Sequence, residues 1–203
     1  MNDNEKKELA DLLIKSHGVV VQSDPIKLSS GKLTNHYYDV KAAILTPRGT
    51  KLVGELGLQA ATQLEAKSVG GLELGAIPIA TLIARESEGT VNPIPAFFVR
   101  KTAKAHGLQK YLEGSQVQSP ALIVDDVVTT GTSTMQAVRA VRELGCKIAG
   151  VMAIVDREED GETLFSENGI PFYSIFTDSD FKEYIDTRKS ALGINPEAYL
   201  RQV

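Results

Sequence analysis

The chain has 203 residues, of which 42% are hydrophobic and 24% are charged, a balance typical of a folded protein with one substantial core rather than of a disordered one. Its formal net charge of −4 argues against bulk attraction to nucleic acid or acidic membranes, so neither is expected as a partner. Cys146 is alone, which excludes an internal disulfide, and the scattered histidines disfavour a Cys/His metal site. Because there is neither a bilayer-length apolar stretch nor a signal-peptide pattern, we expect a cytoplasmic protein.

The first part of the chain predicts two helices separated by a small hood. Residues 5–16 have the spacing of an amphipathic helix, and Gly18 follows its end. Residues 19–45 contain proline, glycine and asparagine turns between short extended runs, which favours a β-rich hood. Thr46 and Pro47 open the next helix, since proline suits the first helical position.

From there, strand and helix patterns alternate. Short apolar runs predict strands, and apolar residues three or four apart predict helices. Strands are expected at 68–72, 94–99, 121–124, 148–155 and 172–176, and helices at 77–86, from Thr132 or Ser133 to Gly145, and at 162–168. Repeated βα units predict a Rossmann-like parallel sheet flanked by helices, in a single domain spanning residues 1–203. Residues 177–203 show no clear pattern.

The most informative segment joins the strand at 121–124 to the following helix. Asp125 and Asp126 come directly after the strand, at the edge where open α/β sheets bind ligands. A turn rich in glycine and hydroxyl groups follows, and free N–H groups at the start of the next helix form a phosphate site. Two carboxylates beside such a site suit a sugar phosphate with a metal nearby. The plain alternative is a solvated turn; the G-x-x-x-x-G-K-[ST] and G-x-G-x-x-G patterns are missing, which disfavours nucleotide hydrolysis and dinucleotide redox chemistry.

The loop at 100–114 has neither helical nor strand periodicity. A loop of this length in a compact domain is typical of a lid or a binding loop. Its basic side chains are Arg100, Lys101, Lys104 and Lys110, joined by His106. So few charges favour a compact polyanion such as a diphosphate over the alternatives of a solvated loop or a nucleic-acid patch.

Three stretches resemble one known family. Residues 123–133 resemble the phosphoribosyl-diphosphate signature of the type I phosphoribosyltransferases, and the form Asp-Asp-Val-x-Thr-Thr-Gly-Thr is most similar to the orotate phosphoribosyltransferase branch. Residues 28–39, with Ser-Ser-Gly-Lys and Tyr-Tyr-Asp, and residues 100–107, Arg-Lys-Thr-Ala-Lys-Ala-His-Gly, resemble the same branch. The resemblance runs from about residue 5 to about residue 175. Three motifs in the same order make coincidence implausible.

The resemblance implies an enzyme that transfers the 5-phosphoribosyl group from phosphoribosyl diphosphate to orotate. The products are orotidine 5′-phosphate and diphosphate, the pathway is pyrimidine (UMP) biosynthesis, and the cofactor is Mg²⁺. The resemblance also implies a homodimer in which the loop at 100–114 closes over the neighbouring subunit's site.

The same resemblance implies roles for individual residues. Those expected around phosphoribosyl diphosphate are Arg100, Lys101, Lys104, His106, Asp125, Asp126, Val127, Val128, Thr129, Thr130, Gly131, Thr132 and Ser133. The expected catalytic residues are Lys104, His106, Asp125 and Asp126, the two aspartates holding ribose hydroxyls near Mg²⁺. Thr129 and Arg157 are expected to bind orotate, the alternative for Arg157 being a surface arginine after a strand.

Two places depart from the family pattern. Ser29 stands where many orotate enzymes carry a hood lysine, and Leu74-Gly75 stands where many carry Tyr-Lys. Diphosphate binding is therefore expected to depend more on the lid and on backbone N–H groups of that turn. Tyr37 and Tyr38 are expected to be hood core residues rather than base contacts. The nearest alternative function is the same reaction on uracil or a purine, and the second is a non-catalytic regulator that binds nucleotide or RNA.

Overall fold

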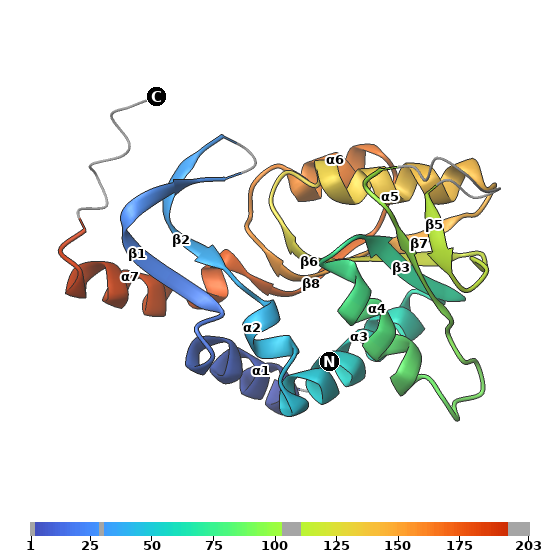
Figure 1. Ribbon diagram of the computed structural model, residues 1–203, viewed down its shortest axis with the longest axis horizontal. Helices are drawn as coiled ribbons and strands as arrows, with labels where there is room; N and C mark the ends of the chain where they lie inside the picture. The colour runs from blue at the N-terminus through green and yellow to red at the C-terminus, as the bar shows by residue number, and fades with distance from the viewer. Residues whose placement is uncertain (1–2, 29–30, 103–110, 195–203) are drawn as a thin grey trace.

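The computed structural model describes residues 3–28, 31–102 and 111–194 (Figure 1). In chain order the elements are α1 (Asp3–Lys15), β1 (Val19–Lys27), β2 (Leu33–Tyr38), α2 (Lys41–Ile44), α3 (Pro47–Gln63), β3 (Ser68–Leu72), α4 (Ala76–Glu86), β4 (Ala96–Val99), β5 (Leu112–Gly114), β6 (Ala121–Val128), α5 (Thr132–Glu143), β7 (Ile148–Asp156), α6 (Gly161–Glu167), β8 (Phe172–Thr177), the 3₁₀ helix η1 (Asp178–Phe181) and α7 (Lys182–Ala191). None of the described helices has the length and apolarity that a bilayer crossing requires.

A six-stranded sheet forms the centre of the molecule, in the order β5-β4-β3-β6-β7-β8. Neighbouring strands are parallel except β4 and β5, which are antiparallel. β1 and β2 form a separate antiparallel sheet beside it (Figure 1). The predicted Rossmann-like parallel sheet and the small β-rich addition near the N-terminus are therefore confirmed.

Helices cover both faces of the central sheet because its strands carry apolar side chains on both sides. On one face, Leu56 of α3 and Ile83 of α4 belong to a buried cluster that includes Leu122 of β6. On the other face, Val138 of α5 belongs to a second cluster, which includes Ile123. Successive residues of β6 thus face opposite layers, as the pleat of a strand requires.

Two sequence predictions need correction, and one segment without a prediction forms a helix. β6 extends to Val128, so Asp125 and Asp126 lie within the strand rather than after it; Asp125 pairs with Ala153 of β7. Residues 112–114 form β5 rather than a continuation of the loop. The sequence did not predict this strand because three residues are too few to show a strand period. Residues 182–191 form α7. Only Ile185 of this helix is buried, so its sequence has no apolar stripe that would predict a helix.

Candidate active site

A cavity of about 660 Å³ opens where β3 and β6 end side by side in the central sheet. From β3 the chain passes to β4 on one side, whereas β6, β7 and β8 lie on the other, so the strand order reverses here. Open α/β sheets bind ligands in the crevice at such a point. The cavity is lined by Lys41, Leu72, Glu73, Leu74, Gly75, Lys101, Asp125, Asp126, Val127 and Ser133. Five of the residues expected around phosphoribosyl diphosphate therefore share one cavity.

The adjacent carboxylates of β6 point to opposite faces of the sheet. Asp125 points toward α5: its Oδ2 accepts a 2.7 Å hydrogen bond from Thr134 Oγ1, and its Oδ1 accepts a 3.0 Å bond from the Asp126 N–H. Asp126 points toward the hood, and its Oδ2 accepts a 2.6 Å bond from Lys41 Nζ. A carboxylate therefore reaches the cavity from each face of the sheet.

The environment of Asp125 disfavours its charged form. Burial is the main cause, and the nearby charge of Asp126 adds to it, so that the pKa of Asp125 is raised to about 7. The hydrogen bonds from Thr134 and from the Asp126 N–H lower this pKa but do not offset the increase. A ligand that brings hydroxyl donors or positive charge to the carboxylate relieves this cost. Ribose hydroxyls and a metal cation are ligands of that kind.

The turn before α5 surrounds a small polar cavity at the start of the helix. A polar cavity of about 40 Å³ is lined by Asp125 and residues 127–134. Gly131 precedes the helix, and no side chain caps it, so the predicted cap by Thr132 or Ser133 is wrong. The first N–H groups of this 12-residue helix thus have no capping side chain, at the positive end of the helix dipole. Such a helix start is a phosphate-binding arrangement.

Gly131 is needed for the shape of this turn. Its φ of 73° lies in the left-handed region, which is unfavourable for residues with a Cβ. A Cβ at this position would also lie 2.8 Å from Cζ of Phe165, which is fully buried. Glycine therefore lets the turn lie directly on α6.

The predicted lid residues are only partly described by the structure. Lys104 and His106 lie outside the described residues. Arg100 donates from Nη1 to Glu113 Oε1 at 2.9 Å, so an acid of β5 pairs with it. Lys101 is exposed and lines the main cavity. Of the two described lid cations, Lys101 is thus the one that faces the carboxylate pair.

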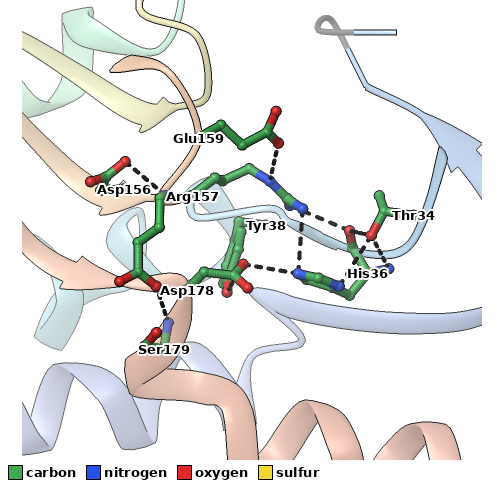
Figure 2. Close-up of polar contacts among 9 residues, drawn as sticks. Thr34, His36, Tyr38, Asp156, Arg157, Glu159, Asp178 and Ser179 are labelled. Carbon is green, nitrogen blue, oxygen red and sulfur yellow. Dashed lines mark hydrogen bonds and ion pairs between the residues drawn. The ribbon is translucent and has the colours of Figure 1, made fainter. Parts of the chain in front are cut away.

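Arg157 follows β7 and is buried, with 9% of its surface exposed, which excludes a surface arginine. Its backbone N–H donates to the Val128 carbonyl at 2.9 Å, beside the end of β6. The guanidinium lies under β2, where Nη1 donates to the His36 carbonyl at 3.4 Å and Nη2 lies 3.3 Å from His36 Nε2 (Figure 2). Nε lies 3.7 Å from Glu159 and has no hydrogen-bond acceptor among the residues that the structure describes. These distances are long for a charged donor, so the buried cation is short of acceptors.

Asp178 supports the hood from below (Figure 2). Its Oδ1 accepts a 2.8 Å hydrogen bond from the Tyr38 hydroxyl and lies 2.9 Å from His36 Nε2. Burial alone would raise the pKa of Asp178, but these two hydrogen bonds and the charges of His36 and Arg157 lower it below the ordinary aspartate value. Tyr38 is buried as a hood core residue, whereas Tyr37 is only partly buried.

Comparison with known proteins places the chain in a family, although no family model matches it. The orotate phosphoribosyltransferase of Aquifex aeolicus is 42% identical over 174 residues, which cover 85% of this chain and 94% of that protein. The chain belongs to the orotate phosphoribosyltransferase family. Another member, from Corynebacterium glutamicum, is 39% identical over 89% of this chain and 95% of its own length. The resemblance inferred from three sequence motifs is confirmed.

Solved structures of the same family have the same fold. The Mycobacterium tuberculosis orotate phosphoribosyltransferase in complex with 5-phospho-alpha-D-ribosyl 1-diphosphate is 33% identical, with a TM-score of 0.70 over 88% of this chain and 99% of that one. The same enzyme in complex with Fe(III) dicitrate is 36% identical, with a TM-score of 0.72 over 87% and 98% of the two chains.

The family implies Mg²⁺, and the residues at the cavity fit it. Asp125 and Asp126 present carboxylate oxygens, which Mg²⁺ prefers, and burial raises the pKa of Asp125, so a nearby cation would favour its charged form. The described residues contain no group of three or more His, Cys, Asp or Glu side chains that could hold a metal ion. Asp125 and Asp126 are the residues that would lie beside a Mg²⁺ in this cavity.

Sequence patterns did not reveal His36, Lys41 or Asp178. His36 and Asp178 are 142 residues apart, and Lys41 is 85 residues from Asp126. No local motif contains both members of either pair, so a single sequence carries no signal for these contacts.

Proposed function

We propose that this protein transfers the 5-phosphoribosyl group from phosphoribosyl diphosphate to orotate, giving orotidine 5′-phosphate and diphosphate in pyrimidine biosynthesis. One observation carries the proposal: the carboxylates of Asp125 and Asp126 and the anion-binding turn at Gly131 meet at the point where the strand order reverses. A ribose 5-phosphate needs acceptors for its hydroxyls and a cradle for its phosphate. Membership of the orotate phosphoribosyltransferase family supports orotate as the base.

The chemistry explains this arrangement. Breaking the bond between ribose C1 and the diphosphate oxygen leaves positive charge on the sugar ring and negative charge on the leaving group. We assign Asp125 and Asp126 to the ribose hydroxyls, where their charge also favours the cationic ring, and residues 127–133 to the 5′-phosphate. Holding the sugar at both ends presents C1 to the attacking nitrogen of orotate. Mg²⁺, when bound, neutralises charge on the diphosphate.

The loop at 100–114 is assigned to the departing diphosphate. Cationic donors stabilise a leaving group of this kind, and closure of a loop excludes water that would trap the sugar cation. The residues assigned to this role are Arg100, Lys101, Lys104 and His106. We also propose a homodimer in which each loop serves the partner's site. The cytoplasmic location stays a prediction.

Mixing two inactive variants tests the shared site. One carries Asp125→Asn with Asp126→Asn, and the other carries Lys104→Ala. If the loop acts on the partner's site, a mixed dimer has one site with both defects and one with neither, so activity should return on subunit exchange. Exchange verified by differently tagged subunits, without recovery of activity, would show that each loop serves its own subunit.

Arg157 and Thr129 are assigned to orotate. The buried guanidinium of Arg157 is short of acceptors, and the orotate carboxylate would supply two in the geometry that an arginine prefers. Orotate would then replace the long contacts to His36. Uracil has no carboxylate, so these donors would keep only their long contacts to His36. Each hydrogen bond to a charged group contributes about 1.5–3 kcal/mol, so uracil should be a poor substrate.

A turnover assay tests the function directly. The protein is incubated with Mg²⁺, phosphoribosyl diphosphate and orotate, uracil, hypoxanthine or adenine, and the consumed base is identified by chromatography. Orotate should be consumed with an equal amount of diphosphate released, and a chelator should stop the reaction. Consumption of another base would keep the reaction class but replace the acceptor. Binding without turnover of any base would instead indicate a regulator.

A further inference from the structure

Lys41 connects the hood to the main cavity. It is the first residue of α2, and its Nζ donates to Asp126 Oδ2 at 2.6 Å. The Lys41 side chain is 45% exposed, whereas that of Asp126 is 17% exposed. The ammonium group therefore has space for partners besides Asp126, and Lys41 lines the cavity together with the carboxylate pair.

The ammonium group has unused donor capacity. A lysine ammonium carries three N–H groups, and Asp126 accepts from one of them. Burial alone would lower the pKa of Lys41, but the hydrogen bond to Asp126 and the charges of Asp126, Asp39 and Asp125 raise it. The group is thus fully protonated at neutral pH. Among the described residues Asp126 is its acceptor, so a positive charge with two remaining donors faces the cavity.

The turn between β3 and α4 provides no positive charge to the cavity. A Cβ at Gly75 would lie 2.3 Å from Asp126 Oδ1 and 2.7 Å from its Cγ, closer than real atoms approach. No side chain at position 75 is compatible with Asp126 in this orientation. The same turn contributes the acid Glu73 and the exposed Leu74. Among the described residues that line the cavity, the cations are Lys41 and Lys101.

We propose that Lys41 is a diphosphate-binding residue, which holds Asp126 with one donor and contacts the polyanion with the others. It supplies a positive charge that the turn at Gly75 does not provide. The identity of the ligand rests on the proposed function. Without this ammonium group, the carboxylates of Glu73, Asp125 and Asp126 would face a polyanion with less compensation, which is electrostatically unfavourable.

Binding of inorganic diphosphate, measured by calorimetry in the presence of Mg²⁺, tests the role of Lys41. Lys41→Met keeps an unbranched apolar side chain, one atom shorter, but removes the charge, and should weaken binding by about tenfold or more, the effect of losing a charge-assisted hydrogen bond. Lys41→Arg should regain most of the affinity. The control Lys51→Met changes an exposed lysine of α3 that pairs with Glu55 outside the cavity, and should bind like wild type. In turnover, Lys41→Met should raise KM for phosphoribosyl diphosphate and leave KM for orotate unchanged.

Wild-type affinity of Lys41→Met for diphosphate would overturn this inference even if the enzyme uses orotate. Conversely, loss of diphosphate affinity in a protein that fails to use orotate would overturn the proposed function and leave the assignment of Lys41 standing. Thermal unfolding checks the fold of each variant. If Lys41→Met does not fold, Lys41→Gln is measured in the same way, and wild-type affinity of that variant overturns the inference equally.

Discussion

Replacing Asp125 with asparagine should stabilise the free protein at neutral and alkaline pH. The pKa of Asp125 is raised from the ordinary 3.8 to about 7 by burial and by the charge of Asp126. Because the folded state binds the proton more tightly than the unfolded state does, this contribution to wild-type stability is fully present below pH 3.8 and is lost as the pH rises to about 7. Asparagine is neutral at every pH, so the stability of the variant does not fall in this way as the pH rises.

The size of the effect follows from the shift. From 3.8 to about 7, linkage gives roughly 4 kcal/mol as an upper limit. Relaxation around the buried charge reduces it, and we expect about 2 kcal/mol, a large part of a typical total stability of roughly 5–15 kcal/mol. Asparagine keeps both local contacts, because its carbonyl can accept from the Asp126 N–H and its amide can donate to Thr134 Oγ1.

Urea unfolding at pH 4, 5, 6, 7 and 8, followed by circular dichroism, measures the effect. Wild type and Asp125→Asn should be nearly equal at pH 4 and should separate as the pH rises, with the variant more stable above pH 7. Asp11→Asn changes an exposed aspartate of α1 and should show no such separation. A difference that does not change with pH, or a variant that is less stable throughout, would refute the reasoning from burial. Turnover should fall in the same variant, which would show that the buried charge lowers stability but is needed for activity.

Three further predictions concern the turn, the base site and the hood. Gly131→Ala should lower the free energy of unfolding by about 2–3 kcal/mol, because the left-handed backbone costs about 1 kcal/mol and the new Cβ meets Phe165. The control Gly145→Ala has a similar φ of 74° but open space around the new Cβ, so it should lower the free energy of unfolding by only about 1 kcal/mol. Equal losses in the two variants would contradict the contact with Phe165. Arg157→Ala should raise KM for orotate about tenfold or more and hardly change KM for phosphoribosyl diphosphate, and comparable increases would remove Arg157 from the base site. Asp178→Asn should cost about 2 kcal/mol in denaturant unfolding at pH 7. Because the folded pKa of Asp178 is lowered, the wild-type advantage should shrink as the pH falls through that pKa, below 3.8, and an advantage that persists there would show that the charge is not its source.

Elements with a complete local pattern could be predicted from the sequence. The start of α3 is an example, since Thr46 Oγ1 accepts from the Gly49 N–H at 3.1 Å and Pro47 is the first helical residue. Elements whose length depends on contacts with their neighbours were harder to predict. β6 continues through two aspartates because β7 pairs with it, and α5, expected to run to Gly145, ends at Glu143.

The candidate site also has one part that could be predicted from the sequence and another part that could not. The carboxylate pair and the phosphate turn lie in one contiguous segment, so the sequence alone brought them together. That Asp125 and Asp126 face opposite layers could not be predicted while the strand was taken to end at Val124. The contact between Lys41 and Asp126 depends on how the hood sits on the sheet, which no local pattern records.

The position of Asp178 has a consequence for how the chain matures during synthesis. β2 contributes His36 and Tyr38, which bond to Asp178, 142 and 140 residues later, and α7 packs against β1 (Figure 1). At about 5–20 residues per second, a ribosome needs roughly 7–28 s to add the intervening 142 residues. The N-terminal hairpin therefore leaves the ribosome early but gains its support only when the C-terminal helix emerges. The phosphate end of the site can form first, and the base end is completed last, so a nascent chain cut short before Asp178 would retain the sugar-phosphate cradle without a secured hood.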